Sequence, residues 1–415
     1  MKSKRTISAV AAASLAVLAA VVLAACGGGD AGESSSSGEV KLGANTEVSG
    51  PFQAYAKPAI TGMEAAAKSI NEEGGIEVEG EGLQASVVVA DNRSEPGAVA
   101  SAAQKVLTEG AIAALGPDIS GEVAYNIWKG KLITFGVAFE QEELAEKHTA
   151  ENPTLFAPTP FFNPLYEANM ESIAKLYPEI KSVAIMAPGN DEGKGAAIAY
   201  EYGAKAAGMS VVEKVIYPEE TTDFSSYLTK IKGKKPGMVI ALQSSPQALA
   251  ILQQADQLKV APFGLNDTIT PDQLAEQGSP ENMTVLIPGF GPTFSKSATI
   301  PDYHPEEIFG SEVPETPAAG IVMYYAYHQL KQAIEAAGTA TDVEKIAENL
   351  VGQSYEGPFG TCEITKGHEN SCENLIEAVD GEKVLVYRYS KAGETDPAEK
   401  YECVAGKCVK AEGAA

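Results

Sequence analysis

A regular alternation of short apolar runs with helical patterns, beginning at Val40, constrains the fold of this chain most strongly. In the first half we expect strands at Val40–Asn45, Leu83–Ala90, Ala111–Leu115 and Lys131–Phe135, with helices between them at Tyr55–Asn71, at Pro96–Glu109 and from about Ser120. Alternation of this kind with short connectors predicts parallel sheets that carry helices on both faces.

The same rhythm returns in the second half of the chain. Strands are expected at Ser182–Ala187, Val211–Tyr217, Pro236–Leu242 and Ala261–Leu265, and helices at about Phe162–Tyr177, Gly195–Ala207, Phe224–Lys232 and Pro246–Leu258. Pro158 and Pro160 interrupt the periodicity between the two runs. The sequence therefore predicts two similar α/β lobes. The later helical patterns, Ala318–Ala337 and Thr341–Leu350, fit either lobe by periodicity alone.

The N-terminus has the features of an export signal. Lys2, Lys4 and Arg5 precede an uncharged stretch from Thr6 to Ala25, which ends in Leu-Ala-Ala before Cys26. A transmembrane anchor is the alternative, because 20 apolar residues can just span a bilayer. The small residues of the stretch and the glycines after Cys26 favour a signal.

We therefore expect residues 1–25 to be a signal peptide and Cys26 to become the acylated first residue of the mature protein. The ending resembles the bacterial lipoprotein signal. Residues 26–39, rich in Gly and Ser, would form a flexible tether. The protein would be exported and lipid-anchored at the outer face of the cell membrane, in the periplasm or on the cell surface.

Size and charge narrow the possible partners. Residues 26–415 suffice for two domains with their own cores. The formal net charge of −25 disfavours nucleic acid, because phosphate binding needs a basic face. It also disfavours direct adhesion to anionic lipid headgroups, so acyl chains would have to supply the membrane attachment.

Four cysteines remain besides Cys26, and all lie near the C-terminus. In an oxidising compartment we expect disulfides, with Cys362–Cys372 and Cys403–Cys408 favoured among three connectivities. A zinc site with four thiolates is the alternative, but the spacings do not match paired CxxC knuckles. We expect no metal ion and no cofactor.

Signatures of enzymes are weak. Residues 189–194 resemble a phosphate-binding loop, but the spacing is short and Gly195 stands where Ser or Thr should hold magnesium. Ser120 lacks the GxSxG frame of a nucleophile elbow. The four histidines are too dispersed to suggest a metal site or a Ser–His pair. We expect no catalytic residues, and we expect the protein not to be an enzyme.

One stretch resembles a known family. Residues 49–55 (Ser-Gly-Pro-Phe-Gln-Ala-Tyr), followed by Gly62, Ala65–Ala67, Ile70-Asn71 and Gly74–Ile76, resemble the opening of branched-chain amino-acid-type (type I) periplasmic substrate-binding proteins of ABC importers. The likeness continues through Asp91, Gly116-Pro117 and the strand–helix series to Asp267, and it resumes weakly at residues 355–360.

The resemblance implies a fold of two Rossmann-like lobes with parallel-type sheets, joined by a three-stranded hinge. Hinge segments would lie near residues 157–162, 288–293 and 356–361. Lobe 1 would comprise residues 40–157 plus 292–357, and lobe 2 residues 158–291 plus 358–415. The helix at Ala318–Ala337 would then belong to lobe 1.

The resemblance also implies a ligand site between the lobes. A ligand carboxylate would be held by Ser120 and by the segment containing Val137 and Ala138, and a ligand ammonium by Asp267. Tyr55 would form part of an aromatic wall. Glu192, Ser244 and Ser245 fall where family members often place tyrosines.

Two departures bear on the ligand. Ala138 lacks the hydroxyl expected at its position, and Glu192 adds a negative charge. Both favour a more polar or cationic ligand than a branched-chain amino acid, such as a basic or polar amino acid, an amide or a urea-like solute. Structural roles remain open: Ser120 as a helix cap, Glu192 in a first helical turn, and Tyr55 and Asp267 in packing and capping.

The sequence thus favours a monomeric, lipid-anchored receptor that closes around a small amino-acid-like or amide-like solute and delivers it to an ABC permease in the membrane. A ligand-sensing receptor of the same fold, signalling through a membrane partner, is the alternative. An enzyme ranks third.

Overall fold

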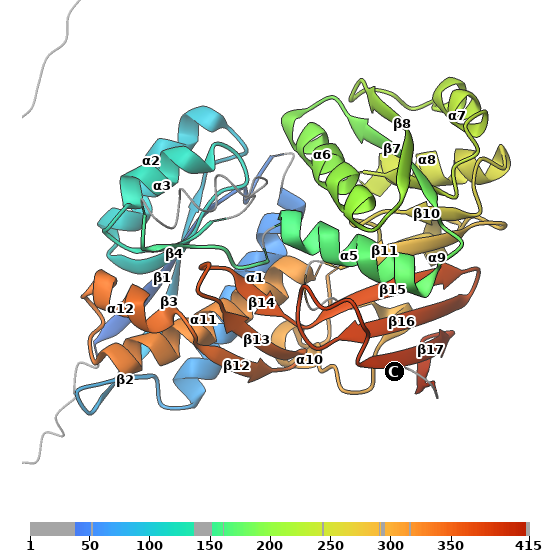
Figure 1. Cartoon of the computed structure of the whole chain (residues 1–415). Coiled ribbons are helices and arrows are strands. Elements are labelled where there is room, and N and C mark those ends of the chain that lie inside the picture. The colour runs from blue at the N-terminus through green and yellow to red at the C-terminus, as the bar shows by residue number, and fades with distance from the viewer. Residues whose placement is uncertain are drawn as a thin grey trace, which may run out of the picture. The chain divides into compact units, whose positions relative to one another are not determined.

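A computed structural model describes residues 38–50, 53–136, 152–160, 162–242, 245–289, 291, 295–314 and 317–411. These residues contain three β-sheets of six, nine and three strands (Figure 1). In the described part of the chain, no helix combines the length and the apolarity needed to cross a membrane.

The six-stranded sheet, called here the N-terminal sheet, has the order β2-β3-β1-β4-β5-β6. Its strands are β1 (Glu39–Thr46), β2 (Ile76–Val78), β3 (Glu81–Asp91), β4 (Ala111–Leu115), β5 (Ile133–Phe135) and β6 (Leu155–Phe156). All neighbours are parallel except the β2–β3 hairpin. The carboxyl ends of the five parallel strands therefore lie along one edge.

Helices cover both faces of this sheet. They are α1 (Gln53–Glu72), α2 (Pro96–Thr108), α3 (Gly121–Trp128), α10 (Glu306–Phe309), α11 (Ala318–Ala337) and α12 (Val343–Leu350). Helices α1 and α11 share a hydrophobic core with β1, whereas α2 and α3 form a separate core around Trp128. Burial on both faces explains why β4 reads as five consecutive apolar residues.

The nine-stranded sheet, called here the C-terminal sheet, has the order β18-β17-β16-β15-β11-β10-β9-β7-β8. Five strands are parallel: β7 (Ser182–Pro188), β8 (Ser210–Tyr217), β9 (Met238–Ala241), β10 (Phe263–Leu265) and β11 (Thr284–Pro288). Four antiparallel strands extend it: β15 (Asn374–Asp380), β16 (Lys383–Tyr389), β17 (Glu399–Val404) and β18 (Lys407–Lys410).

Helices also lie on both faces of the C-terminal sheet. They are α5 (Phe162–Leu176), α6 (Asp191–Ala206), α7 (Ser225–Lys232), α8 (Ser245–Gln257) and α9 (Pro271–Gln277), with a short 3-10 turn η1 (Lys296–Ala298). Helices α5 and α6 share one core with Tyr200 and Tyr389, and α7 and α8 share another with Phe224. Helix α6 begins four residues before the predicted start at Gly195, because Asn190 caps it by accepting a hydrogen bond from the Gly193 amide.

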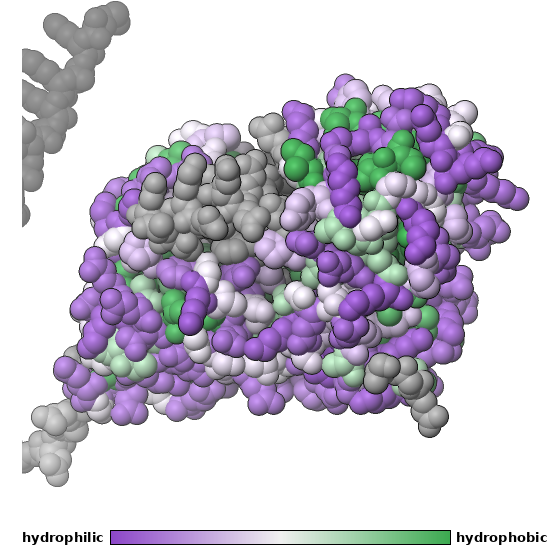
Figure 2. Space-filling model, viewed as in Figure 1, coloured by the Kyte–Doolittle hydropathy of each residue, from purple (hydrophilic) through white to green (hydrophobic). Residues whose placement is uncertain are grey.

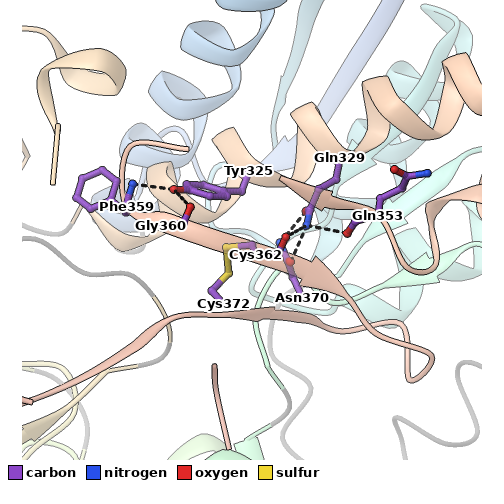
Figure 3. Close-up of a disulfide and its surroundings, with 8 residues drawn as sticks. All are labelled: Tyr325, Gln329, Gln353, Phe359, Gly360, Cys362, Asn370 and Cys372. Atoms are coloured by element: carbon purple, nitrogen blue, oxygen red, sulfur yellow. Dashed lines mark hydrogen bonds between the residues drawn. A yellow bond between two sulfur atoms is a disulfide. The ribbon is translucent and has the colours of Figure 1, made fainter. Parts of the chain in front are cut away.

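The third sheet is a small antiparallel unit of β12 (Ser354–Gly357), β13 (Gly360–Ile364) and β14 (Asn370–Cys372). Cys362 and Cys372 lie opposite each other on β13 and β14 and form a disulfide (Figure 3). A second disulfide joins Cys403 to Cys408 across β17 and β18. Both pairings predicted from the sequence are confirmed.

Helix α11 holds the disulfide hairpin β13–β14 through side-chain hydrogen bonds. Gln329 donates to the carbonyl of Cys362 (3.0 Å) and exchanges two hydrogen bonds with Asn370 (Figure 3). Tyr325 donates to the carbonyl of Gly360 (2.9 Å) and accepts from the amide of Phe359 (2.7 Å). A hairpin too small to be stable alone is thereby fixed to a buried helix.

The hairpin also contacts the chain segment that leaves β6. The amide of Ala157 donates to the carbonyl of His368 (2.7 Å), and the amide of Asn370 donates to the carbonyl of Ala157 (3.0 Å). The His368 ring stacks on Phe156 with ring centroids 4.3 Å apart. Farther along, the Gly289 amide donates to the Leu375 carbonyl (2.8 Å). Three segments distant in sequence thus lie beside one another.

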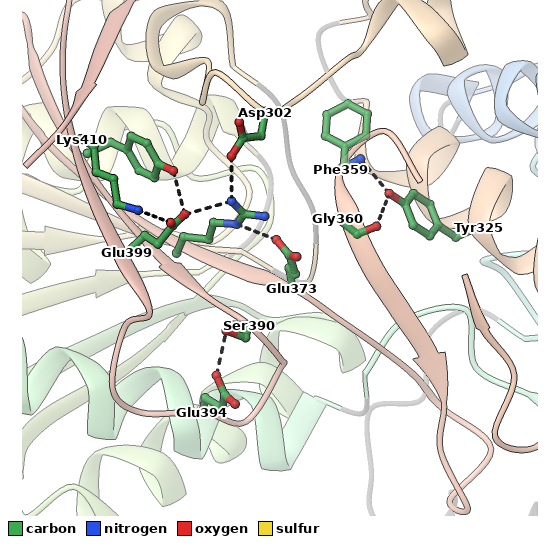
Figure 4. Close-up of polar contacts among 11 residues, drawn as sticks. Asp302, Tyr325, Phe359, Gly360, Glu373, Ser390, Glu394, Glu399 and Lys410 are labelled. Carbon is green, nitrogen blue, oxygen red and sulfur yellow. Dashed lines mark hydrogen bonds and ion pairs between the residues drawn. The ribbon is translucent and has the colours of Figure 1, made fainter. Parts of the chain in front are cut away.

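An ion-pair network fixes the antiparallel extension of the C-terminal sheet (Figure 4). Arg388 on β16 donates to Glu373 (2.6 Å), to Glu399 (3.0 Å) and to Asp302 (3.4 Å). Lys410 and Tyr401 also donate to Glu399, and these hydrogen bonds lower the pKa of the Glu399 carboxyl to about 2. The network joins β16, β17 and β18 to the segment before α10.

The visible surface is largely hydrophilic, as the acidic composition predicts (Figure 2). Small hydrophobic groups appear over α6 and β8, where Ile198 and Ile216 are exposed. The residue boundaries predicted for the two lobes and for the hinge stay predictions.

A glycine-to-glycine contact sets the distance between α1 and α11. A Cβ atom on Gly62 would lie 1.9 Å from the carbonyl oxygen of Gly320, and one on Gly320 would lie 2.5 Å from the carbonyl oxygen of Pro58. Backbone atoms cannot yield as a side chain can, so only glycine allows this approach.

Gly62→Ala is therefore expected to destabilise the protein by about 1–3 kcal/mol through overpacking. Thermal or urea unfolding of the exported domain would measure the effect. Gly97→Ala is the matched control, because nothing lies within 4 Å of its Cβ position; it should change stability between zero and a gain of about 1 kcal/mol. Equal stability of the Gly62 and Gly97 variants would contradict the close contact.

Candidate functional site

Polar residues follow β1, β3 and β4 at the carboxyl edge of the N-terminal sheet. Asn45, Glu47 and Asn92 are completely buried there. The Asn92 side-chain amide donates to Glu47 (3.0 Å) and to Asn45 (3.3 Å), and Asn45 donates to the carbonyl of Val99 (3.1 Å). These hydrogen bonds link the ends of two adjacent strands to helix α2.

A second set of hydrogen bonds shapes the turn after β1. The Ser49 hydroxyl donates to Asp91 (2.7 Å), and the Ser94 hydroxyl donates to the carbonyl of Ser49 (2.9 Å). Ser49, in the segment that carries the family resemblance, is thus held by Asp91 at the end of β3 and by Ser94 in the loop that follows.

Ser120 lies at the N-cap position of α3, beyond the end of β4. Its backbone is left-handed, with φ of 49°, and its exposed side chain makes no capping hydrogen bond. A left-handed residue other than glycine is strained, and such residues are frequent at binding sites. The capping role considered from the sequence is therefore not the role of this side chain.

Asp267 follows β10 at the carboxyl edge of the C-terminal sheet. The preceding residue, Asn266, is buried and arranges the loop: it donates to the carbonyl of Ala241 (2.6 Å) and accepts from the amides of Thr268 (2.8 Å) and Ile269 (2.6 Å). Short polar side chains that bond the backbone two or three residues on are typical of such turns. These hydrogen bonds hold the loop that carries Asp267 in place.

Two tyrosines complete this group. The hydroxyl of Tyr200, on α6, donates to the Asp267 carboxyl (3.0 Å), and Tyr166, on α5, also hydrogen-bonds to it. The two rings stack with centroids 4.3 Å apart, and both residues are buried. We call Asp267, Tyr200 and Tyr166 the acid–tyrosine cluster.

Enclosure of the carboxyl group raises the pKa of Asp267 to about 6, against the lowering effect of the hydrogen bonds from both tyrosines. Burial, followed by the nearby charge of Asp267, raises the pKa of Tyr200 well above its usual value. The phenol therefore remains a donor near neutral pH. The carboxyl group has no cationic hydrogen-bond partner among the described residues.

The structure describes some of the predicted site residues in full, some by their backbone alone, and some not at all. Asp267 and Ser120 are described at the strand ends given above. Glu192 lies in the first turn of α6, Ser245 begins α8, and Tyr55 lies in the first turn of α1, but their side chains are outside the described part. Residues without any description are Val137, Ala138, Ser244 and Cys26.

Sequence reasoning missed Tyr166, Tyr200 and Glu47. Both tyrosines sit in amphipathic helices, where an aromatic residue is usually core. Glu47 lies in a turn-like stretch where an acid is usually exposed. Glu47 follows a strand end directly, and that position is the signal that could have identified it. No group of three or more potential metal ligands occurs within the described ranges.

Comparisons with known proteins bear on this arrangement. The family model described as periplasmic binding protein matches residues 39–382. The chain is 28% identical over 345 residues to the Leu/Ile/Val-binding protein BraC3 of Rhizobium johnstonii, covering 79% of this chain and 88% of that protein.

Solved structures show the same fold. The branched-chain amino acid transporter substrate-binding protein LivJ of Streptococcus pneumoniae, in complex with isoleucine, has a TM-score of 0.64 at 20% identity, covering 90% of this chain and 100% of that one. An ABC transporter solute-binding protein of R. palustris, in complex with benzoate, has a TM-score of 0.64 at 16% identity, covering 90% and 98%.

The fold is that of a type I periplasmic binding protein, with two Rossmann-like lobes, as the sequence predicted. The chain belongs to the periplasmic binding protein family. The similar proteins named above are solute-binding proteins and not enzymes, and the family is exported.

Tyr200→Phe should raise the pKa of Asp267 further, because it removes a hydrogen bond that favours the carboxylate. An NMR titration of the Asp267 carboxyl carbon would measure the shift. Tyr202→Phe is the matched control on the same helix, because Tyr202 is exposed. An unchanged Asp267 pKa in the Tyr200 variant would show that the hydrogen bond does not form.

Proposed function

We propose that this chain is the solute receptor of an ABC importer and that it binds a small amino-acid-like or amide-like ligand between its two lobes. Family membership supports the class of protein. The observation that carries the ligand assignment is the acid–tyrosine cluster, in which a carboxyl group with no cationic hydrogen-bond partner among the described residues lies at the carboxyl edge of a parallel sheet. An amine or amide N–H of the ligand is its natural partner.

Ligand capture would proceed by hinge closure. The carboxyl edges of the two sheets carry the candidate residues, and closure would bring them to opposite sides of the ligand. The hydrogen bonds of Ala157 with His368 and Asn370, and of Gly289 with Leu375, support chain crossings near the hinge segments expected at residues 157–162 and 288–293. Ligand would favour the closed population because only the closed form contacts it from both lobes.

Membrane attachment would come from Cys26. The export assigned to the family supports a cleaved signal, and the Leu-Ala-Ala-Cys sequence supports acylation. Cys26→Ala is expected to release the protein from membranes into the soluble extracytoplasmic fraction, with loss of metabolic labelling by radioactive palmitate. Continued labelling of the variant would exclude Cys26 as the acylated residue.

The function can be tested by a thermal-shift screen of ligand-stripped protein against amino acids, amides, amines and aromatic acids. A ligand at a hundredfold excess over its Kd adds about 2.7 kcal/mol of stability. A screen in which no solute stabilises the protein would count against a receptor.

Affinity for an amine ligand should fall about tenfold between pH 7 and pH 5, because only the ionised form of Asp267, with its pKa of about 6, attracts the ammonium group. Asp267→Asn should bind more weakly and without this pH dependence, as measured by calorimetry. Equal binding by the variant and the wild type would show that Asp267 is not the ammonium partner.

The stability of the unliganded protein gives the control for this test. The folded-state pKa of Asp267 exceeds its unfolded value of 3.8, so the protonated carboxyl group stabilises the folded protein. This contribution to the free energy of unfolding is fully present below about pH 4 and is lost as the pH rises through 6. Asp267→Asn should remove this loss and should not unfold the protein.

A further inference from the structure

Glu47 is a buried carboxylate that receives four hydrogen bonds at the end of β1. Its oxygens accept from the Asn92 side chain (3.0 Å), from the Thr46 hydroxyl (3.2 Å) and from the backbone amides of Asp118 and Ile119 (3.4 Å each). All four partners donate to the carboxyl oxygens. None of these four donors carries a positive charge.

The position of Glu47 in the sheet is specific. The chain passes from β1 to β3 on one side and later to β4 on the other, so the strand order reverses between β1 and β4. In open α/β sheets, ligands bind outside the carboxyl ends of the strands at such a reversal. Glu47 directly follows β1, and the two amides from which it accepts hydrogen bonds, those of Asp118 and Ile119, lie in the loop between β4 and α3.

Backbone amides at such a strand end and helix start are suited to bind an anion. Here the Glu47 side chain already accepts hydrogen bonds from these amides. A ligand carboxylate at this edge would have to compete for the amides and would also meet the charge of Glu47. A ligand amine or amide would meet no such competition.

We propose that Glu47 is a specificity-determining residue that acts as a built-in anion and selects solutes without a free carboxylate, namely small amines and primary amides. This inference rests on the proposed function. Glu47 is a positioning residue, since it is completely buried and acts through the amides of Asp118 and Ile119 and through its charge. The acid–tyrosine cluster at the edge of the C-terminal sheet would also favour solutes with an amine or amide group over solutes with a carboxylate.

The test compares matched ligand pairs that differ only in the carboxylate: isoleucine with isoleucinamide, ornithine with putrescine, and arginine with agmatine. Calorimetry on ligand-stripped wild type should show tighter binding of the carboxylate-free member, by roughly tenfold or more in at least one pair. Glu47→Gln should narrow that ratio about tenfold, because it removes the charge and retains the shape. Glu95→Gln, an exposed acid of the neighbouring loop, should leave the ratio unchanged.

Two results with these ligand pairs would overturn the inference. One is tighter or equal binding of the carboxylate member in every pair by the wild type, a measurement that does not require any variant to fold. The other is a Glu47→Gln variant that loses affinity equally for both members of a pair, as a purely structural residue would. If no pair binds, the solutes of the broad screen decide: binding only of solutes with a free carboxylate overturns the inference and leaves the proposed function standing, and binding of a carboxylate-free amine or amide supports the inference. If no solute binds at all, both fail.

Discussion

Parallel pairing of β1 with both β3 and β4 is the constraint from which the candidate site follows. Because the three strands run in one direction, the residues after Thr46, Asp91 and Leu115 meet at a single edge. The polar side chains there cannot face water individually, since Glu47 and Asn92 are fully buried, and they satisfy one another instead. The C-terminal sheet repeats the principle with Asn266 and Asp267 after β10.

The two edges differ in how their acids are stabilised. Glu47 receives four donors and is an internal part of the N-terminal sheet's edge. Asp267 receives two phenols and an amide of its own loop, and its carboxyl group is held at a raised pKa. A solute placed between them would meet one acid already saturated with donors and one that gains most from a new donor. In the proposed interlobe site, this difference would give the solute a preferred orientation.

Much of the fold could be predicted because its local signals agree with its tertiary contacts. Helix α11 was predicted to the residue, since Pro317 and Gly338 bound an apolar stretch that is buried along nearly its whole length. The strands β12 to β18 were not predicted. Edge strands such as β12 and β18 contain no buried residue and lack an apolar run, whereas β15 and β16 carry apolar runs that could have identified them. For the site, Asp267 and Ser120 came from a resemblance, whereas Tyr166 and Tyr200 depend on how α5 and α6 cross, which no local pattern specifies.

The Cys362–Cys372 bond encloses the turn at Thr365–His368, so both ends of that turn are covalently joined. A protease that cut the backbone inside it would leave the polypeptide in one piece. Helix α11 would still hold the first strand of the hairpin through Gln329, and the Ala157 segment would still hold the second through Asn370. The disulfide thereby protects a hairpin that contacts both the N-terminal sheet, through Phe156, and helix α11, through Gln329.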